Sequence, residues 1–224
     1  MSWPATAVEL AAEQARLATA VWTPWRPRGR FAAGSVFVCF VQNGTGRGDE
    51  GDEGFAAATV DGEVVAASGR ARASYERGAL ALREGALLEA AVRRLSALPD
   101  VLIVDATGRD HPVRCGLAVH LGAVLDVPTV GVTHRPLVAS GEWPGDDRGD
   151  TSPLMLEGEL VGYWLRTRRG ARPLAVHAAW RTGPEAAVEV VLGATGRART
   201  PEPLRRARTA ARRARAEARL TAAR

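Results

Sequence analysis

The sequence contains no lysine, so all 30 of its basic residues are arginines, and only two of its 224 residues are cysteines. Cys39 and Cys115 lie among apolar or small residues, which predicts two buried small side chains rather than a disulfide or a zinc site. No apolar run approaches the ~20 residues of a membrane-spanning helix. The N-terminal residues lack the basic-then-apolar order of a signal peptide. We therefore expect a cytoplasmic protein with no membrane partner.

The chain is rich enough in apolar residues to form a core. Hydrophobic residues make up 46% of the sequence and charged residues 25%, a composition typical of one globular domain. Residues 197–224 carry ten arginines against two glutamates, a net charge of +8, whereas residues 1–196 sum to −3. We therefore divide the chain into a single domain over 1–196 and an Arg-rich C-terminal helix or tail over 197–224. The sequence does not set the oligomeric state, and we favour a monomer.

The arginines of the C-terminal segment recur at helical spacing. Those that would stack along one side of a helix are Arg205, Arg208, Arg212, Arg215 and Arg219. A one-sided cationic helix would bind phosphates and add salt-sensitive, sequence-independent affinity for nucleic acid. The alternative is a frayed, solvated tail with no binding role, and the pattern alone supports both equally.

The rest of the pattern predicts a mixed α/β fold. The expected helices are 5–20, 80–97, 112–125 and one that begins near Pro184. The expected strands are 34–41, 55–60, 63–71, 101–104, 129–132, 160–166 and 174–177. The first three strands have short connections, which favour an antiparallel meander with a tight turn at Asp61-Gly62. From Gly78 onward helices and strands alternate, as in parallel β-α-β units. We predict a ribonuclease H-like mixed sheet, antiparallel in its first three strands and parallel afterwards, flanked by helices.

Asp105 is the first candidate for chemistry. It ends the expected strand 101–104, and ligands of open parallel sheets bind beyond the carboxyl ends of the strands. A carboxylate there, beside a polar loop that contains His111, can hold a metal ion or transfer a proton. That Asp105 merely caps the next turn is about equally supported. Its partner carboxylate would be Glu84, although a lone helical glutamate is most often solvated.

The segment from Asp105 to Gly122, continued by Asp126 to Val132, resembles the endonuclease V family. The family has there an aspartate, Gly-His-Gly, His-Pro-Arg, Gly, Ala, His, Gly and Val-Pro-Thr-Ile-Gly-Val in the same order. Upstream, Tyr75 to Glu84 resembles the family's Pro-Tyr-Ile-Pro-Gly wedge followed by Phe-Arg-Glu. Shorter matches lie at Pro153-Leu154 and at Pro201 to Arg205. The resemblance implies a ribonuclease H-like fold and metal-dependent phosphodiester hydrolysis near deaminated purines such as inosine, in DNA or RNA.

The same resemblance implies a metal site that is incomplete. The family binds a divalent metal, Mg²⁺ or Mn²⁺, through a first-strand aspartate and through the acids at Glu84 and Asp105. The positions that depart from the family's residues are Val36 for that aspartate, Thr107 for the histidine of Gly-His-Gly, His134 for a phosphate-binding lysine, Arg208 for an Asp or His on the last helix, and Ser74 and Arg77 for the wedge prolines. Valine cannot ligate a metal. A metal ion that is misplaced by about 1 Å lowers the rate of hydrolysis on the order of 10²-fold. Rescue by a carboxylate from the acid-rich, flexible segment 43–54 has little support.

Three functions therefore compete. A working, weak endonuclease would bind its metal with Glu84 and Asp105 and act beside an extruded base. A catalytically inactive relative would bind DNA or RNA without cutting it, with Arg208 neutralising phosphate rather than assisting a metal. A repurposed pocket would bind a small molecule or protein partner through His111, His134 and Cys115. The residues expected to contact nucleic acid are Tyr75, Gly78, His111, His134, Arg205, Arg208, Arg212 and Arg215.

Overall fold

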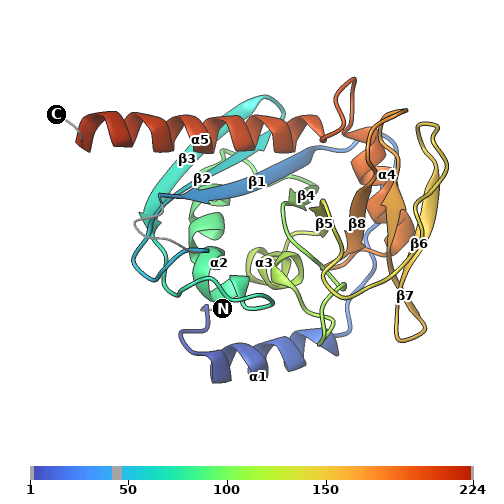
Figure 1. The fold of residues 1–224 in the computed structure, drawn as a ribbon, viewed down its shortest axis with the longest axis horizontal. Coiled ribbons are helices and arrows are strands. Elements are labelled where there is room, and N and C mark those ends of the chain that lie inside the picture. The colour runs from blue at the N-terminus through green and yellow to red at the C-terminus, as the bar shows by residue number, and fades with distance from the viewer. Residues whose placement is uncertain (1–2, 42–46, 223–224) are drawn as a thin grey trace.

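A single mixed β-sheet forms the centre of the molecule in the computed structural model, which describes residues 3–41 and 47–222 (Figure 1). Its strand order is β3-β2-β1-β4-β5-β8-β7-β6. The strands are β1 (Ala33–Phe40), β2 (Glu53–Val60), β3 (Glu63–Arg70), β4 (Val101–Val104), β5 (Thr129–Thr133), β6 (Thr151–Leu156), β7 (Glu159–Leu165) and β8 (Leu174–Ala178). The helices are α1 (Ala7–Ala18), α2 (Leu80–Val92), α3 (Leu117–Leu125), α4 (Pro184–Gly193) and α5 (Glu202–Ala222). The predicted ribonuclease H-like mixed sheet with flanking helices is confirmed.

Strand pairing follows the prediction in one half of the sheet and departs from it in the other. β1, β2 and β3 form the expected antiparallel meander, and the turn at Asp61 and Gly62 has positive φ at both residues, 45° and 92°. β1 pairs parallel with β4, and β4 with β5. β8, β7 and β6 pair antiparallel, so the expectation of parallel pairing there is wrong. The connection 166–173 between β7 and β8 is too short for a parallel crossover, which takes a dozen or more residues.

Helices cover both faces of β4, which explains its wholly apolar sequence. Leu102 and Val104 pack in a cluster with residues of α1, α2 and α3, whereas Val101 and Ile103 pack with residues of α4 and α5. Alternate side chains of a strand point to opposite faces, so all four are buried. The polar residue that follows, Asp105, is thereby fixed at the carboxyl end of a rigid central strand.

The C-terminal helix α5 lies across the sheet on the face of β1 and β2 (Figure 1). Leu204, Ala207 and Ala211 are fully buried at spacings of three and four residues, which is the apolar face of the helix. These small and branched side chains bring the helix close to the strands. The first half of α5 is therefore packed against the sheet, whereas residues 212–221 continue the helix with half-buried or exposed side chains. No helix within the described residues is long and apolar enough to cross a membrane.

Candidate active site

Glu84 and Asp105 line one cavity of about 170 Å³. Asp105 follows β4, and Glu84 lies on the second turn of α2, which packs against the same face of the sheet. Val36 of β1 stands opposite Val104 in the parallel register and also lines the cavity. Its side chain is fully buried. The structure therefore brings the two acids together and places an apolar residue at the strand position where the resemblance implies a third.

Arg208 points from α5 into this site and binds Asp105. Its Nε and Nη2 atoms donate hydrogen bonds of 3.0 and 2.8 Å to the same oxygen, Asp105 Oδ2. The two side chains keep only 15% and 21% of their surface exposed, so water screens the pair weakly. The guanidinium also lies 5.7 Å from the ring centroid of Phe37 on β1. A fixed cation is thus already bound to the acid that would be a metal ligand.

Glu84 has a strongly perturbed acidity. Burial, and next the negative charge of Asp105, raise the pKa of Glu84 to about 8, while Arg83 opposes the shift. Its carboxyl group is therefore mostly protonated at pH 7. A neutral carboxylic acid is a poor ligand for a hard divalent cation, which prefers charged oxygens.

The residues around this cavity do not fit a resident Mg²⁺ or Mn²⁺ ion. Asp105 is bound by Arg208, Val36 has no donor atom, and an ion would have to displace the proton of Glu84. Across residues 3–41 and 47–222, no three His, Cys, Asp or Glu side chains are grouped so that they could hold a metal ion.

Arg83 and the acid-rich segment before β2 form a buried anchor that the sequence did not reveal. Arg83 Nη2 donates to Asp52 Oδ2 at 2.7 Å, with both side chains almost fully buried. Its Nη1 atom donates to the carbonyl oxygens of Asp49 and Ala73 at 2.7 and 2.9 Å. Asp52 is therefore held away from the metal position, which corrects the expectation of a flexible loop there. Residues 43–46 of that expected loop lie outside the described residues.

A second, smaller cavity of about 130 Å³ adjoins Asp105 and is lined by Tyr75, Gly78, Thr107 and His111. Gly78 has φ of +87°, and a Cβ atom there would come within 3.2 Å of His111 Nε2. His111 Nε2 donates to the Gly78 carbonyl at 2.9 Å. The His111 side chain is 5% exposed, and burial lowers its pKa, so it is neutral. It fixes the turn that follows Tyr75 instead of presenting a free nitrogen at the surface.

Behind Thr133 and Leu137, which line this smaller cavity, lies a buried polar array that sequence analysis missed. Asp110 is fully buried and accepts the backbone N–H groups of residues 137–139 at 2.6, 2.9 and 2.7 Å. His177 Nδ1 lies 3.7 Å from Asp110, and its Nε2 lies 2.9 Å from Thr133 Oγ1. Burial lowers the pKa of His177 to about 4 despite the nearby carboxylate. The partners come from β5, β8 and two loops, so no local sequence pattern indicates them.

His134 and Cys115, two polar groups of the repurposed-pocket interpretation, differ in accessibility. His134 is exposed, and its Nδ1 accepts a hydrogen bond of 3.1 Å from Arg199. Partial burial, and then the charges of Arg199 and Arg208, lower the pKa of His134. Cys115 is fully buried, and burial raises its thiol pKa to about 12. The thiol therefore stays protonated and inside the core.

The arginines of α5 extend from Asp105 to a basic cavity of about 340 Å³. That cavity is lined by Phe40, Arg47, Tyr75, Arg83, Glu84, Arg215 and Arg219. Arg212 lies 5.7 Å from the Phe37 ring, and Arg215 donates to the Phe40 carbonyl at 3.2 Å. Arg205 is different, because Glu202 binds it on the exposed first turn of the helix. The cationic surface therefore runs from Arg208 toward the C-terminus of α5 and reaches Tyr75.

Comparisons with known proteins agree on one family. A family model described as Endonuclease V matches residues 56–209. The Endonuclease V of Streptomyces avermitilis is 37% identical over 225 residues, which cover 96% of this chain and 95% of that protein. The Endonuclease V of Roseiflexus sp. is 42% identical over 133 residues, 59% of this chain. That match spans 60% of the Roseiflexus protein, less than two thirds of its length.

Solved structures show the same similarity. The crystal structure of the Streptomyces avermitilis Endonuclease V superposes with a TM-score of 0.84 and 33% identity, covering 97% of this chain and 96% of that chain. The Ciona intestinalis Endonuclease V, in complex with a 24mer DNA containing an inosine followed by a ribo-adenosine, superposes with a TM-score of 0.77. It is 19% identical and covers 94% of this chain and 97% of that chain, a likeness of fold.

Proposed function

The chain belongs to the endonuclease V family. From this membership we propose that it binds nucleic acid in the cleft formed by the three cavities around Glu84, Asp105 and Tyr75, and that the family's metal-dependent cleavage is impaired. The observation that carries the proposal is the pair between Arg208 and Asp105, beside Val36. Where the family has an acidic centre that binds a cation, this chain has an aspartate that is neutralised by an arginine. The change supports a binding role more than a cutting role.

The energetics of the Arg208–Asp105 pair favour this proposal. A metal ion would have to displace the guanidinium from Asp105 Oδ2 and then deprotonate Glu84, whose pKa is about 8. Cleavage also needs the ion at a defined place against the attacking water and the leaving oxygen. Arg208 instead offers a positive charge that can neutralise a phosphate directly.

The surroundings of the pair suit a nucleic-acid strand with an extruded base. Tyr75 stands between the basic cavity and the smaller cavity next to Asp105, so one aromatic ring separates a phosphate-binding surface from an enclosed one. The family neighbour from Ciona intestinalis is bound to inosine-containing DNA. We expect an extruded purine such as inosine to enter the smaller cavity while Arg212 and Arg215 contact the backbone. Either DNA or RNA can present such a base.

The proposal is tested with an inosine-containing oligonucleotide and the same oligonucleotide with adenine. Binding is measured by fluorescence anisotropy at several salt concentrations, and cleavage is measured in Mg²⁺, in Mn²⁺ and in EDTA. We expect salt-sensitive binding, tighter for inosine, with little cleavage in either metal. Efficient Mn²⁺-dependent cleavage that Asp105→Ala abolishes would establish a working endonuclease and overturn the impaired state. A lack of binding at low salt would overturn the nucleic-acid role itself.

A further inference from the structure

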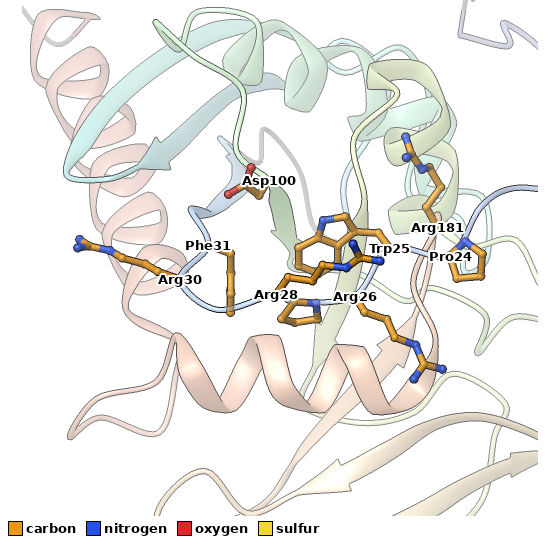
Figure 2. Close-up of a pocket in the computed structure, with 9 residues that line it drawn as sticks. Pro24, Trp25, Arg26, Arg28, Arg30, Phe31, Asp100 and Arg181 are labelled. Atoms are coloured by element: carbon orange, nitrogen blue, oxygen red, sulfur yellow. The ribbon is translucent and has the colours of Figure 1, made fainter.

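A separate basic cavity of about 610 Å³ lies at the other end of β4, beside the segment that joins α1 to β1 (Figure 2). Asp100, which lines it, precedes β4, and Asp105 follows the strand. Five residues of extended chain separate these two positions by roughly 16 Å. The cavity has the volume of a small-molecule site. It lies outside the cleft described above.

The segment that forms the cavity is held at both ends. Trp25 N donates to the Arg181 carbonyl at 2.7 Å. Ala32 N donates to Asp100 Oδ2 at 2.8 Å, and Asp100 N donates to the Ala32 carbonyl at 3.0 Å. The rings of Trp25 and Phe31 meet edge to face, 6.0 Å apart, and both pack against the core. The aromatic part of the cavity is therefore rigid, which lowers the entropic cost of binding.

Three cations of this segment have no partner among the described residues. Arg26, Arg28 and Arg30 alternate along the chain and are exposed, and within the described residues none of them forms a hydrogen bond or ion pair. In Figure 2 the Arg28 side chain lies beside Trp25, whereas Arg26 and Arg30 extend away from the ring on opposite sides. Arg181 makes a 3.4 Å contact with Asp126, whose side chain is 82% exposed. Solvated pairs of this kind contribute little, so Arg181 is also available to an anion.

A nucleotide matches this combination of groups. The ring of Trp25 lines the cavity and offers a stacking surface for a base, and the exposed guanidinium groups of the same lining suit phosphate oxygens. The carboxylate of Asp100 is already bonded to the Ala32 backbone and leaves the cavity with a net positive lining. We propose that this cavity is a second phosphate-binding site, which holds a nucleotide by stacking on Trp25 and by ion pairing with Arg26, Arg28 and Arg30. The nucleotide is either free or part of a strand.

The test uses the full chain and two probes, ATP without metal and a ten-residue oligothymidylate, with binding measured by isothermal titration calorimetry. The site variant is Arg26→Ala/Arg28→Ala/Arg30→Ala. The matched control removes three exposed arginines elsewhere and is Arg93→Ala/Arg168→Ala/Arg169→Ala. We expect the site variant to weaken binding of at least one probe by on the order of tenfold and the control by less than about twofold. Equal losses in both variants, or binding of neither probe by the wild-type protein, would overturn the site.

Two further arms separate the sources of the ligand and remove the contribution of the cleft. Tight binding of ATP alone identifies a free nucleotide, whereas tight binding of the oligonucleotide with competition from ATP identifies a strand. Each titration is repeated in an Arg212→Ala/Arg215→Ala background, in which the cleft is weakened. If the second site binds the probe, the loss of affinity caused by the Arg26, Arg28 and Arg30 substitutions is the same in both backgrounds. A loss that disappears in this background would assign the binding to the cleft and end the proposal, without touching the proposed function.

Discussion

Two arginine–aspartate pairs flank Glu84, and they differ in what surrounds them. The pair of Arg83 and Asp52 is almost fully buried, with side chains 3% and 2% accessible. The Arg83 guanidinium also lies 4.2 Å from the Phe40 ring centroid. The pair of Arg208 and Asp105 keeps 15% and 21% accessible and opens onto cavities. The same two residue types therefore form a buried anchor in one place and a partly accessible pair beside the candidate site in the other.

The first prediction separates the two pairs by stability. Asp52→Ala leaves the buried Arg83 guanidinium without its carboxylate, and we expect a loss of ~3–5 kcal/mol in the free energy of unfolding. Asp105→Ala, the matched comparison, removes a partner that is more accessible and should cost less, about 1.5–3 kcal/mol. Urea unfolding followed by circular dichroism measures both. Equal losses would mean that the two pairs have the same structural role.

The second prediction concerns Glu84, which lies between the two pairs and makes the stability of the protein depend on pH. Its pKa of about 8 in the folded protein lies above the ordinary 4.5, so between these pH values the unfolded chain ionises while the folded protein holds the proton. Stability that is present below pH 4.5 is therefore lost as the pH rises toward 8, by as much as ~1.4 kcal/mol per pH unit. We expect the wild type to lose stability relative to Glu84→Gln between about pH 5 and 8. Parallel stability curves for the two proteins would contradict the raised pKa.

The third prediction concerns conversion of the Arg208–Asp105 pair into a metal site. Val36→Asp with Arg208→His replaces the apolar residue by a carboxylate and removes the guanidinium from Asp105. We expect Mn²⁺ affinity to rise by on the order of tenfold or more, or about 1.4 kcal/mol, by calorimetry. Val36→Asp alone should gain less, because Arg208 still holds Asp105. If the double variant binds no more Mn²⁺ than the wild type, then Glu84, Asp105 and position 36 do not converge on one ion.

Sequence reasoning predicted the parts of this comparison that depend on local pattern. The apolar run before Asp105 and the family-like spacing around Glu84 indicated that both acids belong to one site. The direction of Arg208 was not predictable, because it depends on how Leu204 and Ala207 seat α5 against the strands. The Arg83 anchor joins positions 31 residues apart and left no periodic signal. Such contacts are set by tertiary packing, which the order of residues alone does not reveal.

The last prediction tests how far the binding surface extends along α5. Arg215 bonds to the Phe40 carbonyl and lines the basic cavity near Tyr75, whereas Arg205 is bound by Glu202 on the exposed first turn. Arg215→Ala should weaken binding of an oligonucleotide and lower the slope of log affinity against log salt by about 1. Arg205→Ala removes the same charge but should change that slope much less. A difference between the two slopes reflects the position of the arginine, because the two variants have the same formal charge. Equal slopes for the two variants would mean that the helix attracts nucleic acid as a diffuse cation, with no preferred path from Asp105 to Tyr75.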